Sequence, residues 1–183
     1  MVENESIFKI SPQKEIPELP DIKDKMTIDV RYPLLEPYAY AHIYWDKEQE
    51  ELIYAVEEPD LNESEKEILR LIMLALEEMI NISIAKVDKV NLLIEYLEKN
   101  VQSILVELGT KVSKETYLKL MYYIFRDSVG LNKIEGMLKD FYIEDIECNG
   151  LNFPVYIVHR KYENLRSNLI FTDMQELTDF VEK

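Results

Sequence analysis

The first part of the chain in which apolar and polar residues alternate predicts a β-hairpin. Aromatic and small apolar residues fill residues 38–45, and a second alternating stretch covers residues 51–56. The intervening residues 46–50 are polar and charged. This pattern is typical of two strands joined by a polar turn.

A second alternating stretch lies near the end of the chain. Apolar residues recur at every second position on both sides of a four-residue turn at 161–164, over residues 155–169. A short strand is predicted just before it, over residues 143–148, followed by the turn signal Asn149-Gly150. These three strands together predict a small three-stranded antiparallel sheet.

The middle of the chain has an apolar spacing of three and four residues, which predicts helices. Asn62 and Glu65 have the spacing of an N-terminal capping box. A second helix is predicted from near Asp88 to Gly109, a residue suited to the position after a helix. Its apolar residues form a heptad seam of Val90, Ile94, Leu97, Val101, Ile104 and Leu108. So short a seam favours a bundle core over a dimeric coiled coil.

Two more helices complete the pattern. Ser113 is placed to cap a third helix, whose apolar face carries Tyr117, Met121, Ile124 and Phe125. A last helix opens at residues 172–175 with another capping-box spacing. The amphipathic pattern is still running at Lys183, which suggests a fragment of a longer protein.

The N-terminal residues 1–30 show no sustained period. Pro12, Pro17 and Pro20 oppose both helix formation and strand pairing. We therefore expect an extended arm.

Composition and charge narrow the function classes. The chain has 183 residues and a formal net charge of −15, which disfavours nonspecific binding to nucleic acids and to acidic membranes. No apolar run approaches the roughly 20 residues needed to span a bilayer. The single cysteine, Cys148, cannot form an internal disulfide, which fits a reducing compartment. These features together predict a cytoplasmic protein with no membrane span and no nucleic-acid partner.

The sequence contains no recognisable catalytic centre. With four glycines in all, it has neither a phosphate-binding P-loop nor a dinucleotide-binding glycine motif. His42 and His159 lack the neighbours of a metal site, so no metal is expected, and Cys148 is interpreted as an inert buried thiol. No catalytic residue is therefore assigned within this chain.

Arg160 and Arg166 are the candidate binding residues. They are six residues apart on the second hairpin, where the acidic chain concentrates positive charge. Arginine offers a fixed fork of donors suited to phosphate or carboxylate. The alternative is that both are solubilising charges paired with nearby acids.

Three stretches together resemble a known family. They are Val30-Arg-Tyr-Pro-Leu-Leu-Glu-Pro-Tyr-Ala-Tyr-Ala-His-Ile-Tyr-Trp45, Tyr122-Tyr-Ile-Phe-Arg-Asp-Ser-Val-Gly-Leu-Asn-Lys-Ile-Glu135 with Ile143-Glu-Asp-Ile146, and Val155-Tyr-Ile-Val-His-Arg-Lys-Tyr-Glu-Asn-Leu-Arg-Ser-Asn168. In this order they are similar to the N-terminal region of archaeal type II/IV secretion-system ATPases, which include pilus-assembly and archaellum motor ATPases. The resemblance covers roughly residues 30–183.

The resemblance implies an α+β fold in three parts. Residues 1–30 would form the arm, and residues 31–110 a first subdomain with the early hairpin and helices. Residues 111–183 would form a second, PAS-like α/β subdomain carrying the three-stranded sheet and the arginine hairpin, ending before the ATPase core.

The resemblance also implies a function. This chain would be the regulatory and force-transmitting part of a hexameric ring, with Arg160 and Arg166 contacting nucleotide phosphates across the cleft to the core. ATP and Mg²⁺ would be bound by the intact parent protein and not by this chain alone, which lacks the Walker motifs and should be inactive. Partners would be its own core, neighbouring subunits and a membrane platform protein that holds it at the inner face of the membrane. The alternative is a stand-alone cytoplasmic interaction module with no catalytic role.

Overall fold

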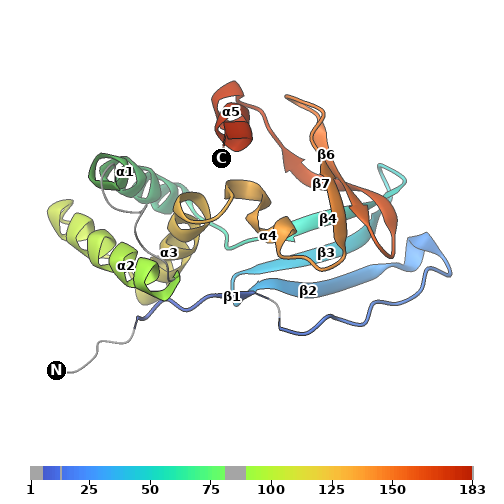
Figure 1. Ribbon diagram of the computed structural model, residues 1–183, viewed down its shortest axis with the longest axis horizontal. Coiled ribbons are helices and arrows are strands. Elements are labelled where there is room, and N and C mark those ends of the chain that lie inside the picture. The colour runs from blue at the N-terminus through green and yellow to red at the C-terminus, as the bar shows by residue number, and fades with distance from the viewer. Residues whose placement is uncertain (1–5, 13, 81–89, 183) are drawn as a thin grey trace. The chain divides into compact units, whose positions relative to one another are not determined.

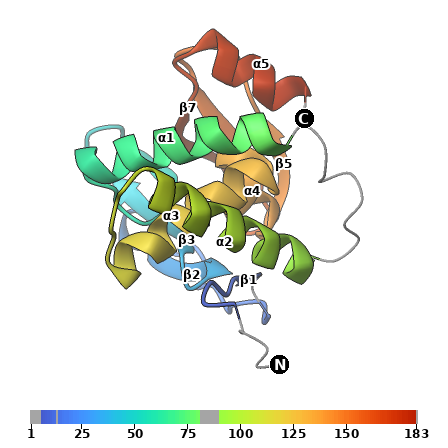
Figure 2. The same ribbon diagram turned by 90° about the vertical axis from the view of Figure 1, so that its left-hand side faces the viewer.

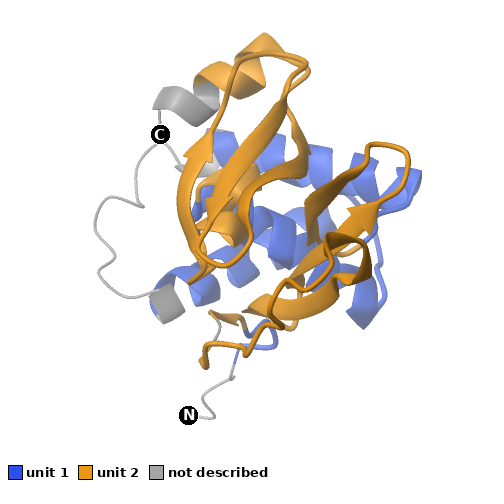
Figure 3. Ribbon diagram, turned by 90° about the vertical axis from the view of Figure 1, so that its right-hand side faces the viewer, with its two compact units in different colours: residues 1–9, 60–130 blue, residues 10–59, 131–183 orange. Residues whose placement is uncertain are grey.

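The computed structural model describes residues 6–12, 14–80 and 90–182. The chain divides into two compact units, coloured separately in Figure 3. The helical unit comprises Met1–Lys9 and Asp60–Gly130, and the sheet unit comprises Ile10–Pro59 and Leu131–Lys183. Each unit is thus built from two separate stretches of sequence.

The helical unit contains α1 (Glu63–Ile80), α2 (Val90–Glu107) and α3 (Lys114–Ser128), seen in Figure 2. Each of the three helices contacts the other two. Their facing apolar side chains are almost fully buried, among them Ile72, Leu76, Leu97, Val101, Leu120, Met121 and Ile124. Ile94, Leu97, Val101 and Ile104 of the predicted seam are therefore bundle core, whereas Leu108, just after the end of α2, is 41% exposed.

The helix ends follow the local signals. The Glu65 backbone N–H donates to Asn62 Oδ1 at 2.9 Å, and the Asn62 N–H donates to Glu65 Oε2 at 3.0 Å, so the predicted capping box is confirmed. Ser113 caps α3 by accepting from the Thr116 N–H. Gly109 follows α2 with a φ of +63°, in the left-handed region that glycine adopts without steric cost. The predicted start of α2 near Asp88 lies outside the described residues.

A short N-terminal segment is packed within the helical unit. The ring of Phe8 is 1% exposed and lies 6.1 Å from that of Phe125. The Phe8 backbone N–H donates to the buried carboxylate of Glu98 at 2.8 Å. This part of the predicted extended arm is therefore docked on its own chain.

The sheet unit is built on one curved, seven-stranded sheet with the order β1-β2-β3-β4-β7-β6-β5 (Figure 1). The strands are β1 (Ser11–Pro12), β2 (Asp29–Glu36), β3 (Ala39–Asp46), β4 (Glu51–Glu57), β5 (Ile143–Glu147), β6 (Pro154–His159) and β7 (Glu163–Ile170). All neighbouring pairs are antiparallel except β4 and β7, which run parallel with Ile53 opposite Arg166. Both predicted hairpins are present, as β3–β4 and β6–β7.

This sheet corrects the predicted fold class. We expected the early hairpin to belong to a helical subdomain and the later strands to form a separate three-stranded, PAS-like sheet. Instead, β7 pairs with β4 and joins both hairpins in a single half-barrel. The pairing is reinforced by Asn168, whose side chain bonds the N–H and C=O of Val56 from 112 residues away. A contact at that separation leaves no mark in the local pattern, so the prediction was wrong.

Two strands, β1 and β2, were not predicted from the sequence. Pro12 of the expected arm lies in β1 opposite Leu35 of β2, so the expectation that it would oppose strand pairing was wrong. β2 contains Pro33, which has no N–H to donate to a neighbouring strand. The pairing register of β2 against β3 shifts between Pro33 and Leu35, so the proline occupies an irregularity in the ladder. The unit is completed by the helices α4 (Glu135–Leu138) and α5 (Met174–Glu182) and the 3₁₀ turns η1 (Lys25–Thr27) and η3 (Asn132–Ile134).

The short helix α4 packs on β2 and β3. A Cβ atom added to Gly136 would lie 3.2 Å from a methyl group of Val56 and 3.5 Å from one of Leu34. The neighbouring Met137 is fully buried. Glycine at this position therefore allows α4 to lie close to the sheet, which places the following Asp140 in the interior.

Candidate functional site

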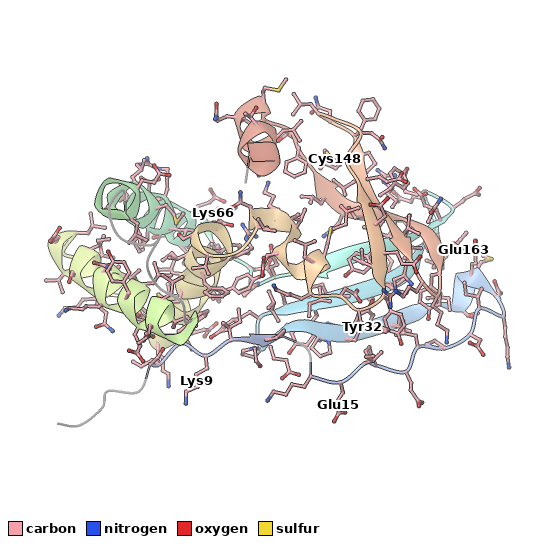
Figure 4. The ribbon with its side chains drawn as sticks, in the orientation of Figure 1. Lys9, Glu15, Tyr32, Lys66, Cys148 and Glu163 are labelled. Atoms are coloured by element: carbon pink, nitrogen blue, oxygen red, sulfur yellow. The ribbon has the colours of Figure 1, made fainter. Side chains whose placement is uncertain are left out.

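The hairpin β6–β7 presents both predicted arginines. Residues 160–162 form its turn, and Glu163, labelled in Figure 4, opens β7 with a φ of +61°. Arg160 lies in the turn itself, whereas Arg166 lies further along β7, opposite Tyr156. The two residues therefore lie at different positions along the hairpin, one in the turn and one within a strand.

Arg160 is directed toward β5. Its backbone N–H donates to the Tyr142 carbonyl at 2.8 Å. Its guanidinium lies 4.6 Å above the ring of Phe141, and Nε is 3.5 Å from a carboxylate oxygen of Glu144. The side chain is 45% exposed. Arg160 is thus held by a cation–π contact and one long, solvent-exposed ion pair.

Arg166 is directed toward the β3–β4 turn. Its Nη1 donates to Gln49 Oε1 at 2.6 Å and lies 3.3 Å from Glu51 Oε1. The side chain is 26% exposed. Arg166 is therefore more firmly bound than Arg160.

The two guanidiniums do not share a partner. β5 and β4 flank the hairpin on opposite sides in the strand order, and each arginine pairs with the nearer flank. The residues predicted to act together are thus present on one exposed scaffold, but in this structure each faces its own carboxylate.

A buried polar cluster lies inside the sheet unit, and the sequence analysis missed it. Asp140 is 5% exposed, and its Oδ2 accepts from the hydroxyls of Tyr32 at 2.7 Å and Tyr54 at 2.8 Å. Its Oδ1 accepts from the Tyr142 N–H at 2.8 Å. Burial raises the pKa of Asp140 above its ordinary value, although these hydrogen bonds act in the opposite direction. Burial and the neighbouring carboxylate also raise the pKa of both tyrosines.

His159 extends this cluster. Its ring is stacked between those of Tyr142 and Tyr162, at centroid distances of 5.3 and 5.0 Å. Its Nδ1 accepts the backbone N–H groups of Lys161 and Tyr162 at 3.2 and 3.1 Å. The ring proton is therefore on Nε2, which lies 3.4 Å from the Tyr32 hydroxyl. Burial lowers the pKa of His159 to about 4, so the ring is neutral.

The cluster connects three strands of the sheet unit with the segment that follows α4. Tyr32 is in β2, Tyr54 in β4 and His159 in β6, while Asp140 follows α4. Figure 4 shows Tyr32 on β2. The only signal for it in the sequence was that inward-facing tyrosines need a hydrogen-bond partner. Because its polar atoms are occupied by one another, we interpret the cluster as a structural centre.

His42 occupies a different setting, on a more exposed part of the sheet. Its Nδ1 lies 2.9 Å from Glu57 Oε1, and its Nε2 lies 2.8 Å from Asp29 Oδ1. Arg31 binds the other oxygen of Glu57 at 2.5 Å and stacks on Tyr40. The two carboxylates meet opposite nitrogens of the ring, so they do not converge on a point where a cation could sit.

The remaining candidates are accounted for. Arg126, on α3, binds Asp127 through two hydrogen bonds of 2.7 and 3.1 Å. Cys148 is half-buried rather than buried. Nowhere in the described ranges do three His, Cys, Asp or Glu side chains gather as a candidate metal site. Among the helices of the described residues, none combines the length and apolar character needed to cross a bilayer.

Comparison with known proteins places the chain among archaeal relatives. No protein-family model matches it. It is 31% identical over 180 residues to "Uncharacterized protein MJ1288" of Methanocaldococcus jannaschii, an alignment that covers 97% of this chain and 68% of that relative. It is also 32% identical over 72 residues to "Uncharacterized protein MJ0900" of the same organism, which is 39% of this chain and 13% of that relative. The chain therefore belongs to the same protein family as MJ1288 of Methanocaldococcus jannaschii.

Proposed function

We propose that this chain is the N-terminal regulatory and force-transmitting domain of a secretion or pilus-assembly ATPase. In this proposal Arg160 and Arg166 contact the nucleotide phosphates bound by an adjoining ATPase core. ATP and Mg²⁺ would be held mainly by that core. The arginines would neutralise phosphate charge and couple nucleotide state to the closure of the interdomain cleft.

The observation that supports the proposal is the partial exposure and weak pairing of the two guanidiniums. Both stand on one hairpin, partly exposed, and each is paired with partly exposed carboxylates. Such surface pairs contribute only about 0–1 kcal/mol. Replacing a carboxylate with a phosphate therefore costs little, and arginine binds phosphate through the same fork of donors.

The two arginines are not equivalent in this mechanism. Arg160 would leave one ion pair at 3.5 Å and a cation–π contact with Phe141, whereas Arg166 would leave a hydrogen-bond acceptor at 2.6 Å and a carboxylate at 3.3 Å. Arg160 can therefore reorient toward a phosphate at lower cost. We propose Arg160 as the principal contact and Arg166 as the supporting one.

The relatives are compatible with a domain that occurs inside longer proteins. The 72 residues matched in MJ0900 are 13% of that protein, so the matched region is a small part of a much longer chain. A secretion ATPase would have this organisation, with the phosphate-binding core in the remaining sequence.

The first test is the reading frame of the gene beyond Lys183. The proposal requires a Gly-x-x-x-x-Gly-Lys-Ser/Thr motif in the same polypeptide. Its absence from the complete gene product would contradict the assignment, whatever the arginines do.

The second test is kinetic and uses the intact gene product. Arg160→Ala should lower ATP turnover roughly 10- to 100-fold, the value of one hydrogen bond to a charged group, and Arg166→Ala should lower it less. Arg70→Ala is the matched control, because Arg70 is an exposed arginine paired with Glu67 on α1. Unchanged turnover in both hairpin variants would exclude the phosphate role.

A stand-alone interaction module is the second candidate. It is favoured by the fact that both arginines already have carboxylate partners within the chain. In that case both hairpin variants should behave like Arg70→Ala in every nucleotide assay. A complete gene product without a P-loop would favour this candidate.

A further inference from the structure

An extended segment, residues 14–24, crosses the sheet unit between β1 and η1; we call it the strap. It runs beneath β2 in the view of Figure 1, and the labelled Glu15 points away from the sheet in Figure 4. Within the described chain, residues 14–23 make no backbone-to-backbone hydrogen bond. Only Leu19 of the strap is buried, at 8% exposure, and most of its other residues are exposed. The strap is thus lightly held for its length.

The strap is bound by side chains that donate hydrogen bonds to its backbone carbonyls. The Tyr142 hydroxyl donates to the Pro17 carbonyl at 2.5 Å, and the Tyr162 hydroxyl donates to the Pro20 carbonyl at 2.9 Å. The Lys161 ammonium donates to the Leu19 carbonyl between them. Three successive donors therefore contact a four-residue stretch of extended chain.

Two features add selectivity to this backbone contact. The Leu19 side chain is buried, and the Lys161 ammonium forms an ion pair with Asp21 at 2.9 Å. The bound stretch reads Pro17-Glu-Leu-Pro-Asp21. The site therefore accepts an extended, proline-containing segment with one apolar anchor followed by an acid.

The two tyrosine donors are positioned by contacts that do not involve the strap. The rings of Tyr142 and Tyr162 stack on the two faces of His159, with interplanar angles of 20° and 8°. The backbone N–H groups of Lys161 and Tyr162 are held by His159 Nδ1. The two tyrosines and the backbone of Lys161 are thus held by His159, whereas the strap has no backbone partner over residues 14–23 within the described chain. Aromatic surfaces that donate hydrogen bonds to extended proline-rich chain are a common mode of peptide recognition.

We propose that Tyr142, Lys161 and Tyr162 form a peptide-binding site for an extended, acidic, proline-containing segment of a partner protein. The strap occupies this site as a tethered ligand, and a partner segment of the same chemistry displaces it. Tethering gives the strap a high effective concentration, so the site is closed until a partner competes. This inference rests on the strap contacts alone and is independent of the proposed ATPase function.

The direct test opens the site and supplies the ligand separately. Changing Pro17→Gly, Leu19→Ser and Pro20→Gly together removes the anchor and the stiff residues of the strap but leaves the site intact. The probe is a fluorescein-labelled synthetic peptide with the sequence of residues 14–24, followed by fluorescence anisotropy. We expect saturable binding to this open variant, and at least tenfold weaker binding to the wild-type chain because a docked strap occupies about nine-tenths or more of its sites.

Matched variants locate the binding. In the open variant, Tyr162→Phe removes one donor and should weaken peptide binding about fivefold. Tyr156→Phe makes the same change on the same hairpin, away from the strap contacts, and should leave binding unchanged. A peptide with serine in place of the leucine that corresponds to Leu19 should bind more weakly than the parent. Equal binding in all of these pairs, or no saturable binding to a folded open variant, would overturn the proposal.

A second measurement uses the wild-type chain and does not depend on the open variant folding. Excess unlabelled peptide should shift the amide NMR signals of the non-proline residues in 14–24 toward random-coil positions while leaving those of β3 and β4 unchanged. Strap signals that are insensitive to the peptide would show that the segment is a permanent part of the fold, and would exclude displacement. A third outcome is possible without peptide: at high protein concentration the chain could form a dimer in which each copy binds the strap of the other. In that case the occupant of the site would be a second copy, and the partner-protein proposal would be wrong.

Discussion

The interior of the helical unit and the interior of the sheet unit are stabilised by different kinds of interaction. In the helical unit, apolar stripes meet in a core that includes Leu97 and Val101, and caps close the helix ends. In the sheet unit, an interior carboxylate, Asp140, collects two tyrosine hydroxyls beside a neutral His159. One unit is stabilised mainly by burial of apolar surface, and the other also depends on a satisfied polar centre.

This difference changes how each unit should respond to a single substitution. Apolar cores lose stability in proportion to the volume removed. Buried polar networks lose more, because deleting one member leaves its partners unpaired in a low dielectric. Two optical signals follow the units separately. Trp45 in β3 is the only tryptophan in the sequence, and the helices α1, α2 and α3 dominate the far-ultraviolet circular dichroism.

The largest effect is expected for Asp140→Ala. The hydroxyl of Tyr54, which is fully buried, loses its acceptor, and that of Tyr32 keeps only the long contact to His159. Two such losses should lower the free energy of unfolding by about 4 kcal/mol. Urea unfolding followed by Trp45 fluorescence measures the change.

Asp140→Asn is the control for that substitution. It keeps an oxygen acceptor of the same shape, so it should retain more than half of the stability that the alanine variant loses. A loss below about 1 kcal/mol for Asp140→Ala would mean that the polar cluster is not a structural centre.

A somewhat smaller effect is expected for Leu97→Ala in the helical unit. Leu97 is fully buried in the seam of α2. Removing its side chain should cost about 3 kcal/mol from lost burial and the cavity left behind. Urea unfolding followed at 222 nm measures it, and Leu92→Ala, at an exposed position of the same helix, is the matched control. Equal losses for the two leucines would contradict the bundle-core assignment.

The third prediction separates the units by pH. The pKa of His159 is lowered to about 4 by burial, so the unfolded state takes up a proton below pH 6.5 while the native state does not. The contribution of His159 to the free energy of unfolding is therefore fully present above pH 6.5 and is lost as the pH falls toward 4. Between pH 7.5 and 4.5 the loss should be about 2–3 kcal/mol. The raised pKa of Asp140 acts in the opposite direction, because the native state then binds the extra proton.

His159→Asn isolates the histidine contribution. Asparagine offers an oxygen acceptor in place of Nδ1 and does not titrate. The variant should therefore lose less stability than the wild type over the same pH interval, whatever its stability at pH 7.5. Parallel pH profiles for the two proteins would show that His159 does not carry the dependence.

The amount that the sequence predicted also differs between the units. Helix starts at Asn62 and Ser113 and the end at Gly109 were predicted correctly, because each depends on residues within a few positions. Both hairpins were predicted for the same reason. The last helix shows the limit of this precision: Asp173, not Thr172, accepts the N–H groups of Gln175 and Glu176.

Features built from distant residues were not predicted. Tyr54 and Asp140 are 86 residues apart, and Tyr162 and Pro20 are 142 apart. No periodicity or motif connects such pairs, since their proximity depends on β7 pairing in parallel with β4. The arginine hairpin was identified as a scaffold, but the direction of each guanidinium depends on which flanking strand supplies its carboxylate. The sequence therefore pointed to the two arginines but not to their separate partners, and it did not indicate the buried cluster around Asp140.

The smallest effect is expected for Asn62→Ala, and it tests the local side of the comparison. The substitution removes the acceptor for the Glu65 N–H at the start of α1 and should cost about 1 kcal/mol, measured by urea unfolding at 222 nm. Asn62→Asp keeps a side-chain oxygen at the same place and should stay near the wild-type value. The Asn62 N–H, followed by the Thr116 hydroxyl, lowers the pKa of Glu65, and neither group is removed by these changes. If Asn62→Ala lowered the free energy of unfolding as much as Leu97→Ala, the cap would stabilise tertiary structure rather than one helix end. The contrast between a unit specified by local residues and a unit specified by distant ones would then not hold.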